Sequence, residues 1–251
     1  QPEPHRFDVW EHSLRTVEAA DAILVELDGL APWGAELRAH LAEALGGGIT
    51  RQETLKLAAL LHDVAKPETR AVEAGRIRFL GHDVAGARRA EAVGARWKLP
   101  GDATAVLAKL VVQHLRPMHL AQSGGVTRRA RYRFCRDLAD ESRDLVLLAL
   151  ADAAALRGDP PLEVWRGPGG AILRDLLAGL GEERAAAAAP PLLRGEDVMA
   201  AFGLAPGPEV GRLLDRAREA QALGLVSTRE EALAFLRRPP ADSLDTPEGR
   251  P

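Results

Sequence analysis

The chain has only one cysteine among 251 residues, so no internal disulfide can form and a secreted, disulfide-held scaffold is excluded. Its formal net charge of −3 excludes a protein that is basic overall, although a local basic face remains possible. No apolar run approaches the ~20 residues that a membrane-spanning helix needs. No signal-peptide pattern is visible either. We therefore expect a cytoplasmic protein with no membrane association.

What the sequence does contain is a strong helical signal. Hydrophobic residues make up 46% of the chain, enough for the core of one large domain or two small ones. Thr50 with Glu53, and Thr228 with Glu231, form capping boxes ahead of apolar helical segments. No regular alternation of strands and helices is present, which argues against a doubly wound sheet. The sequence predicts an all-α fold.

Two short segments refine this prediction. Residues 145–150 are apolar almost all round, which indicates a buried helix. Residues 76–79 alternate as a short strand would, although an extended loop explains them equally well.

The best candidate linker is the alanine run 185–189, which two prolines close. It predicts a helical domain over residues 1–184 and a small helical tail over 190–238. Residues 239–251 are rich in Pro, Asp, Gly and Thr and are expected to be disordered. Because the first residue is Gln1, we expect either a fragment or a processed form of a longer chain.

The most informative segment is the His62-Asp63 pair at the end of an apolar helix. An imidazole and a carboxylate placed there need polar partners. Side chains of neighbouring helical residues diverge by about 100°, so a cation near the helix end is what both could reach. Four more polar residues rise from separate helices or their edges, as in a helical bundle that builds a central metal site: His12, His82, His114 and Asp152.

In this order, the six residues resemble the HD superfamily of metal-dependent phosphohydrolases. Further stretches resemble the HD domain of bacterial tRNA nucleotidyltransferases: residues 79–87, 99–100, 112–116 and 151–158. Others resemble the C-terminal segment of those enzymes: residues 193–198, 207–211, 219–221 and 228–232. The resemblance covers about residues 8–237. It implies a helical HD-domain bundle followed by a small helical tail.

The resemblance also implies a metal site. One divalent ion would be bound by His12, His62, Asp63 and Asp152. His82 and His114 match residues that hold a second ion, with Asp63 bridging. Mn²⁺, Mg²⁺, Co²⁺ or Ni²⁺ suits mixed imidazole and carboxylate ligands, and Zn²⁺ or Fe²⁺ is a further option. Hydroxide formed at the metal would then attack phosphorus in line. With one ion only, His82 or His114 would bind phosphate or protonate the leaving oxygen.

Several basic residues are candidates for binding phosphate or RNA: Lys66, Arg88, Arg89, Arg116, Arg128 and Arg129. Lys66 lies one turn from His62, but it could equally pair with Glu68. The arginine-rich stretch 128–136 could follow a phosphate backbone. A solvated helix face with ion pairs inside the helix explains that stretch at least as well.

Other polar residues have simpler interpretations. Asp152 could pair with Arg157 instead of a metal. We expect His5 and His40 to face solvent and His119 to lie on a surface loop.

The family's nucleotide-adding head carries paired aspartates, and no Asp-x-Asp occurs in this sequence. The chain alone is therefore not expected to add nucleotides, whether a head was removed or the chain is a stand-alone HD protein. The implied activity is hydrolysis of 2′,3′-cyclic phosphates, 2′-nucleotides or phosphomonoesters on nucleotides or RNA 3′ ends, with tRNA as a possible partner. Two alternatives stay open: a nucleotidase for free mononucleotides, and a tRNA-binding fragment with a structural HD site. The sequence leaves the oligomeric state open.

Overall fold

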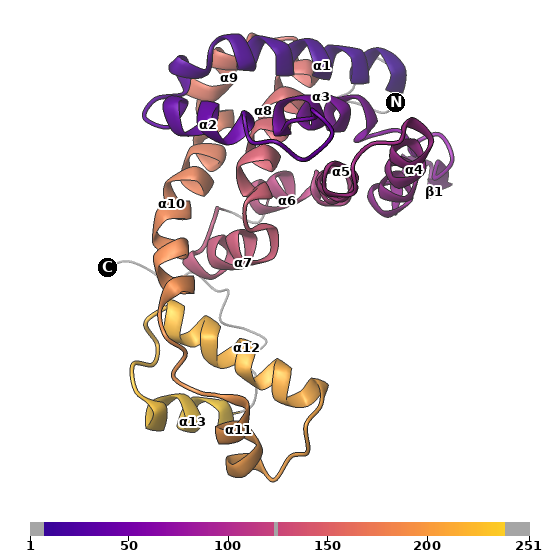
Figure 1. The fold of residues 1–251 in the computed structure, drawn as a ribbon. Helices are drawn as coiled ribbons and strands as arrows, with labels where there is room; N and C mark the ends of the chain where they lie inside the picture. The colour runs from indigo at the N-terminus through magenta and orange to yellow at the C-terminus, as the bar shows by residue number, and fades with distance from the viewer. Residues whose placement is uncertain (1–7, 123–124, 239–251) are drawn as a thin grey trace. The chain divides into compact units, whose positions relative to one another are not determined.

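The computed structural model describes residues 8–122 and 125–238, and this part of the chain is all-α apart from one small hairpin, as predicted (Figure 1). It divides into two compact units. Unit 1 contains the described residues up to Gly125 together with Leu138–Ala178. Unit 2 contains Val126–Asp137 and the described residues from Gly179 onward.

Unit 1 holds most of the helices. In chain order its elements are α1 Val9–Val25, the 3-10 turn η1 Leu27–Leu30, α2 Gly34–Leu41, α3 Arg51–Leu61, β1 Ala71–Glu73, β2 Arg76–Arg78, α4 His82–Trp97, α5 Gly101–Gln113, α6 Arg116–Gln122, α8 Glu141–Arg157, α9 Pro161–Arg166, the 3-10 turn η2 Pro168–Gly170 and the first part of α10 Ala171–Ala188. The capping box of Thr50 and Glu53 starts α3, as the sequence predicts.

Helix α8 forms the centre of unit 1 and packs against α1, α3 and α5. Its segment 145–150 is almost wholly buried, which confirms the prediction from its all-round apolar pattern. The helix ends at Gly158, whose φ of +75° is the left-handed conformation that glycine adopts without strain.

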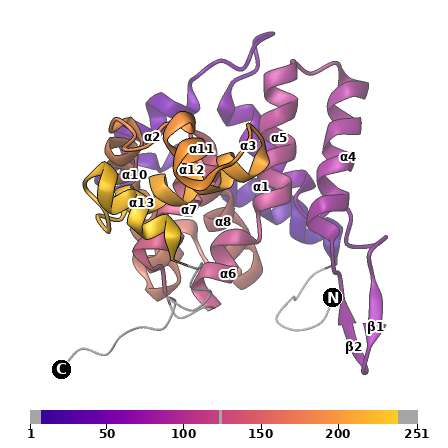
Figure 2. The same ribbon diagram turned by 90° about the horizontal axis from the view of Figure 1, so that it is seen from below.

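Helices α4 and α5 run side by side and approach closely at two glycines (Figure 2). A Cβ atom at Gly94 would lie 2.6 Å from Thr104 Oγ1, and one at Gly86 would lie 3.0 Å from Val111 Cγ1. The absence of side chains at these positions therefore allows the two helices to pack at this distance.

Of the two interpretations of residues 76–79, a short strand or an extended loop, the strand is the one present: Arg76–Arg78 form β2, which pairs antiparallel with β1. The two turn residues, Ala74 and Gly75, have φ values of +48° and +76°, as a two-residue hairpin turn requires. Strand β1 was not predicted, because its three residues are all exposed and show no alternation of buried and exposed positions. Figure 2 shows the hairpin projecting beside the start of α4.

Unit 2 contains most of α7 Arg128–Leu138, the end of α10, α11 Gly195–Phe202, α12 Pro208–Ala222 and α13 Arg229–Arg237. Its core consists of buried apolar residues: Leu193, Val198, Val210, Leu213, Ala217, Ala220, Val226, Ala232 and Leu236. The capping box of Thr228 and Glu231 starts α13, as predicted.

The unit boundary differs from the expected division into residues 1–184 and 190–238. Unit 2 begins at Gly179 and also includes Val126–Asp137. The alanine run continues α10 to Ala188, because alanine favours helix, and the helix stops before the prolines. The residues expected to be disordered, 239–251, lie outside the described part of the chain.

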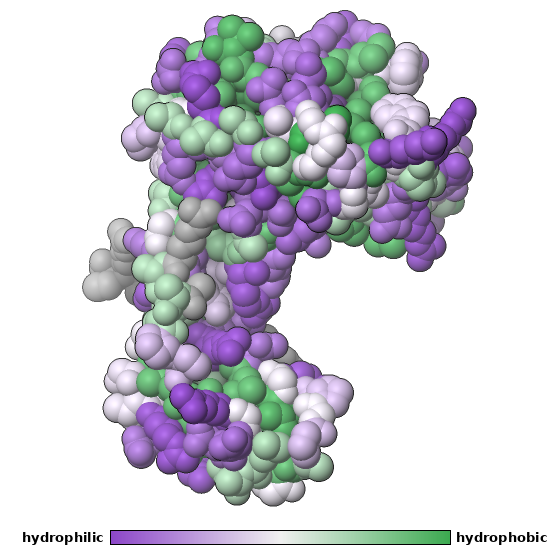
Figure 3. Space-filling view, viewed as in Figure 1, coloured by the Kyte–Doolittle hydropathy of each residue, from purple (hydrophilic) through white to green (hydrophobic). Residues whose placement is uncertain are grey.

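The outer surface mixes polar and apolar side chains. On the face drawn in Figure 3, hydrophobic residues lie among hydrophilic ones. Within the described residues, no helix combines the length and the apolar character that crossing a bilayer requires.

Candidate metal centre

The structure brings the six predicted ligands together from five helices of unit 1. His12 lies on α1, His62 and Asp63 follow the last residue of α3, His82 begins α4, His114 follows α5 and Asp152 lies on α8. Their ligand atoms form two groups, each within 4.8 Å: His12, His62 and Asp152, and Asp63, His82 and His114. All are buried except Asp152, whose side chain is 35% exposed.

Asp63 presents one oxygen to His12 and His62 and the other to His82 and His114. Its Oδ2 lies 3.3 Å from His62 Nε2 and 3.8 Å from His12 Nε2. Its Oδ1 lies 3.4 Å from His82 Nε2 and 3.6 Å from His114 Nε2. One carboxylate can therefore offer an oxygen to a cation on either side.

Three of the imidazoles are held by the backbone. Each places Nδ1 against the carbonyl oxygen three residues earlier: His62 at 2.9 Å from Ala59, His82 at 2.6 Å from Phe79 and His114 at 2.7 Å from Val111. Because a carbonyl only accepts, Nδ1 must carry the proton, and in the neutral ring Nε2 is left as a lone pair. This is the orientation that metal-binding histidines adopt.

These lone pairs meet one another and the carboxylates. His82 Nε2 and His114 Nε2 lie 3.2 Å apart, and two acceptors cannot form a hydrogen bond without a proton between them. His62 Nε2 is buried and makes no hydrogen bond of normal geometry within the described residues. A buried polar atom of this kind requires an explanation, and a cation between the rings provides one.

The remaining two residues complete the first group. His12 Nε2 lies 2.9 Å from Asp152 Oδ1, which is 3.8 Å from His62 Nε2. Asp152 thus contacts the predicted ligand His12. Its position inside an otherwise apolar stretch of α8 turns the carboxylate toward α1 and α3.

The electrostatics of the site call for positive charge. Burial opposes charging of His62, but Asp63 and then Asp152 outweigh it and raise the pKa of this imidazole to about 9. Burial likewise opposes ionisation of Asp63, yet His62, His114 and His82 hold its pKa well below the ordinary value. Burial also opposes ionisation of Asp152, yet His12 and His62 together lower its pKa.

Lys66 is a further cation at this site. It is buried, its Nζ lies 2.6 Å from Asp63 Oδ2, and it sits 5.7 Å from the centre of the Phe79 ring. Glu68, the partner considered for it from the sequence, is bound by Arg89. Lys66 therefore contributes directly to the charge balance around Asp63.

The predicted arginines are distributed over both units. Arg88 and Arg89 are exposed on α4, and Arg116 is half-buried at the start of α6. Arg128 and Arg129 belong to unit 2 and are engaged within it. Arg128 donates to the carbonyls of Leu223 and Ala222, and Arg129 lies 2.9 Å from Glu219.

The expected ion pairs inside the arginine-rich stretch are present only in part. Arg136 pairs with Asp137 within α7. Arg133 instead binds both carboxylate oxygens of Glu219 on α12, each at 2.9 Å. These contacts join α7 to α12, which explains why residues 126–137 belong to unit 2.

Two histidine predictions were wrong. His40 does not face solvent: it is 5% exposed, and its Nε2 lies 2.8 Å from Asp144 Oδ2. The pairing across 104 residues gave no local signal. His119 is exposed as expected, but it lies on α6 and not in a loop. His5 lies outside the described residues.

The fold and the site define a class of protein first: an all-α protein with a buried cluster of imidazoles and carboxylates suited to a divalent cation. The sequence model of the HD domain family matches residues 9–156. The chain therefore belongs to the HD domain family, and HD domains bind divalent metals.

Two curated relatives are tRNA nucleotidyltransferases. The chain is 42% identical over 205 residues to the A-adding tRNA nucleotidyltransferase of Deinococcus radiodurans, covering 79% of this chain and 45% of that protein. It is 43% identical over 185 residues to the CC-adding tRNA nucleotidyltransferase of Thermus thermophilus, covering 72% of this chain and 39% of that protein. The chain thus spans less than half the length of these relatives.

Proposed function

We propose that the chain is a metal-dependent phosphohydrolase acting on phosphoesters of nucleotides or RNA 3′ ends. Its substrates would be 2′,3′-cyclic phosphates, 2′-nucleotides or phosphomonoesters. The observation that carries the proposal is the arrangement around Asp63, which offers one oxygen to His12 and His62 and the other to His82 and His114. Membership in the HD domain family supports metal-dependent hydrolysis.

The donor set fits one or two divalent ions. His12, His62, Asp63 and Asp152 would hold the first, and His82 and His114 would hold a second with Asp63. Mixed imidazole and carboxylate ligands suit Mn²⁺, Mg²⁺, Co²⁺ or Ni²⁺, with Zn²⁺ and Fe²⁺ as further candidates. When bound, such an ion supplies a Lewis acid that polarises a phosphoryl oxygen and makes water nucleophilic at neutral pH.

The chain's own residues take the remaining roles. Lys66 balances the charge of Asp63 and presents an ammonium to a substrate phosphate. With a single ion bound, His82 and His114 bind phosphate or pass a proton to the leaving oxygen. Arg88, which is exposed on α4, and Arg116 are proposed to attract the substrate electrostatically.

The test is a metal and substrate panel on the full chain. The protein is stripped with EDTA, reloaded with each metal, and assayed with bis-p-nitrophenyl phosphate, 2′,3′-cyclic AMP, 2′-AMP, 5′-AMP and RNA ending in a cyclic phosphate. We expect metal-dependent turnover that Asp63→Asn abolishes. Asp102→Asn, the same change at an exposed carboxylate of unit 1, should leave turnover unchanged. Turnover that persists without metal, or in Asp63→Asn, would refute the assignment.

The same panel separates two other functions. Turnover of 5′-AMP alone would favour a nucleotidase for free mononucleotides. The second candidate is a tRNA-binding segment whose HD site is structural, favoured by the names of the relatives and by the partial coverage of their length. Binding of tRNA without hydrolysis in the presence of any of the metals would support that function instead.

A further inference from the structure

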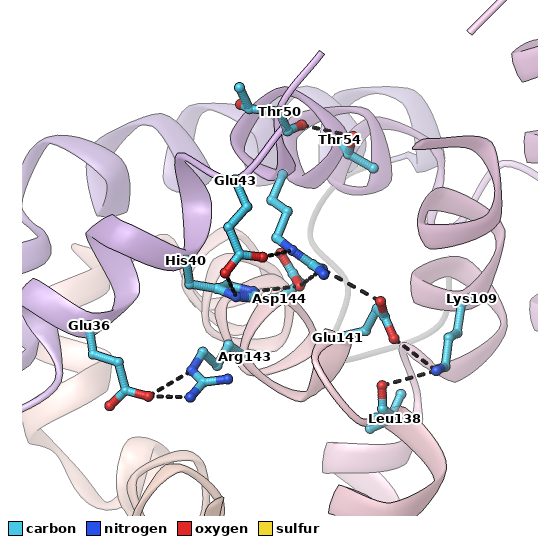
Figure 4. Close-up of polar contacts among 11 residues, drawn as sticks. Glu36, His40, Glu43, Thr50, Thr54, Lys109, Leu138, Glu141, Arg143 and Asp144 are labelled. Carbon is cyan, nitrogen blue, oxygen red and sulfur yellow. Dashed lines mark hydrogen bonds and ion pairs between the residues drawn. The ribbon is translucent and has the colours of Figure 1, made fainter. Parts of the chain in front are cut away.

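A second buried polar cluster, made of other residues than the candidate metal ligands, lies in unit 1 (Figure 4). At its centre is Asp144, which has no exposed surface. Its Oδ2 lies 2.8 Å from His40 Nε2 and 3.0 Å from Arg51 Nη1. We call His40, Arg51 and Asp144, with Glu43, Glu141 and Lys109, the ion-pair cluster.

The outer members extend the cluster to other elements. Arg51 Nε donates to Glu43 at 2.8 Å, and Arg51 Nη1 lies 3.5 Å from Glu141. Lys109 Nζ then donates to the other Glu141 oxygen at 2.8 Å and to the carbonyl of Leu138 at 2.9 Å. The cluster therefore joins the end of α2 to α3, α5 and α8.

Three of these helices also carry candidate metal ligands, and in each the ion-pair residue comes first. On α3, Arg51 precedes His62 by eleven residues, about 16 Å along the axis and nearly on the same helix face. On α8, Asp144 precedes Asp152 by eight residues, about 12 Å. On α5, Lys109 precedes His114 by five residues.

Arg51 contacts Asp144 near the start of both helices, and His62 approaches Asp152 toward their ends. Helices α3 and α8 therefore run in the same direction, with the ion pairs at one end and the candidate ligands at the other. A slip of one residue along a helix axis moves a ligand by about 1.5 Å. Such a slip would disrupt the 3.8 Å approach of His62 to Asp152. A buried polar pair can specify one register between packed helices, because any other register leaves its groups unpaired.

The energetics of buried ion pairs also favour a role in setting helix register. A buried ion pair is often no more stabilising than apolar side chains of similar volume, so its best-attested use is in setting register. Here burial opposes the charge on Arg51, yet Asp144 and Glu43 outweigh it and raise its pKa, so the guanidinium stays charged. Buried charges are an expensive way to fill a core unless they specify geometry, the more so because Asp144 Oδ1 has no hydrogen-bond partner among the described residues.

We propose that the ion-pair cluster sets the axial register of α3, α5 and α8 and thereby holds the metal ligands at binding distance. Arg51, Asp144 and Glu141 are positioning residues in this view, since none contacts the ligand groups. The inference rests on the proposed metal site. Loss of a residue that contacts a metal ligand typically changes metal affinity by 10- to 100-fold, and we expect the more remote ion-pair cluster to act at or below the lower end of that range.

The test measures the Mn²⁺ dissociation constant of the full chain by isothermal titration calorimetry, together with the thermal midpoint. Asp144→Asn and Arg51→Met are expected to raise the dissociation constant about tenfold. Glu141→Gln leaves the Arg51–Asp144 pair in place and should raise the dissociation constant about threefold. It serves as the milder variant should Asp144→Asn or Arg51→Met fail to fold. Leu30→Ala is the matched control, because Leu30 is fully buried in η1 and contributes no polar group.

The outcomes separate the two proposals. If the cluster sets register, the ion-pair variants lose affinity while Leu30→Ala, at a comparable loss of thermal midpoint, stays within about twofold of the unaltered chain. Equal dissociation constants across all variants would leave the metal site intact and overturn the positioning role. Failure of the unaltered chain to bind Mn²⁺ would refute the metal site itself, and the positioning role with it.

Discussion

Unit 1 contains two buried polar clusters that differ in how their atoms are paired. In the ion-pair cluster, Asp144 Oδ2 meets both an imidazole and a guanidinium, and Lys109 satisfies Glu141. In the candidate metal centre, imidazole nitrogens face one another at 3.2 Å and His62 Nε2 is left without a normal hydrogen bond. Among the described residues, each cluster leaves one buried atom without a hydrogen bond, Asp144 Oδ1 in the first and His62 Nε2 in the second. The candidate metal centre differs because its imidazole nitrogens face one another, an arrangement that suits a cation.

Burial alone does not distinguish the two clusters. Asp144 and Asp63 are both buried, and both contact histidine. What differs is the kind of contact: a guanidinium and one imidazole lie within 3.0 Å of Asp144 Oδ2, whereas four imidazole nitrogens lie 3.3 to 3.8 Å from the two oxygens of Asp63, beside the Lys66 ammonium. Imidazole nitrogens that face one another therefore point to a cation site more securely than a buried carboxylate does.

The largest expected effect breaks the metal centre at its shared carboxylate. Asp63→Asn removes the charge that both ligand groups use while keeping the side chain's shape. Loss of metal catalysis is worth several kcal/mol, so we expect kcat/KM for the best substrate to fall about 10³-fold. Steady-state kinetics with the preferred metal measure this. A fall of less than tenfold would show that Asp63 is not central to the reaction.

The next effect concerns stability in the other cluster. Asp144→Asn removes one charge from a buried pair and leaves Arg51 without the one of its counter-ions that has no exposed surface. Such a change typically costs about 3 kcal/mol. Urea unfolding without metal checks it, with the exposed Asp102→Asn as the neutral control. A change in unfolding free energy below about 1 kcal/mol would show that the contact between Arg51 and Asp144 contributes little to stability.

Metal binding should stabilise the chain through the candidate metal centre. Mn²⁺ at 100 times its dissociation constant is expected to stabilise the folded chain by about 2.7 kcal/mol, which raises the thermal midpoint of a domain of this size by about 5–10 °C. The gain should disappear with EDTA. It should also be absent from His62→Ala, measured by differential scanning fluorimetry. A metal-induced gain that survives in His62→Ala would place the ion elsewhere.

The smallest effect uses a solvent-exposed polar group in unit 2 as a reference. Thr228→Ala removes the side chain that accepts from the backbone N–H of Glu231 at the start of α13. Loss of such a cap costs about 1 kcal/mol. Circular dichroism melting reports this, and Mn²⁺ titration should give the same dissociation constant as the unaltered chain. Weaker metal binding would show that unit 2 influences the metal centre.

The same cap has a pH dependence of defined sign. Hydrogen bonds from Ser227 and Thr228 lower the pKa of Glu231 below its usual 4.5. A carboxylate whose pKa is lowered on folding adds stability that is complete above the unfolded value and is lost as pH falls through the folded value. Glu231→Gln should therefore lower the melting midpoint at pH 7, and this difference should shrink below about pH 4.5. A difference that persists in acid would contradict the role of charge.

Much of the fold and the location of the site could be predicted from the sequence. The capping boxes at Thr50 and Thr228 rest on local hydrogen bonds, so their residues carry the signal directly. The six candidate ligands were selected because polar residues interrupt apolar helices in an order that resembles a known family. The structure brings their ligand atoms into two groups, each within 4.8 Å.

The rest depended on contacts between distant residues. Arg51 and Asp144 are 93 residues apart, and nothing near either one identifies its partner. The assignment of residues 126–137 to unit 2 rests on Arg133 and Glu219, 86 residues apart. The lone-pair geometry at the metal centre depends on main-chain carbonyls, which every residue has and which therefore leave no mark in the sequence.

Those carbonyls have a consequence for how the site can change over evolutionary time. The acceptors that orient His62, His82 and His114 belong to the backbone at Ala59, Phe79 and Val111. A substitution at any of these three positions replaces a side chain but keeps the acceptor, provided that the helix end keeps its path. The orientation of the three imidazoles therefore does not depend on which side chains stand at these positions. Related chains can diverge at those neighbours and still present the same three nitrogens.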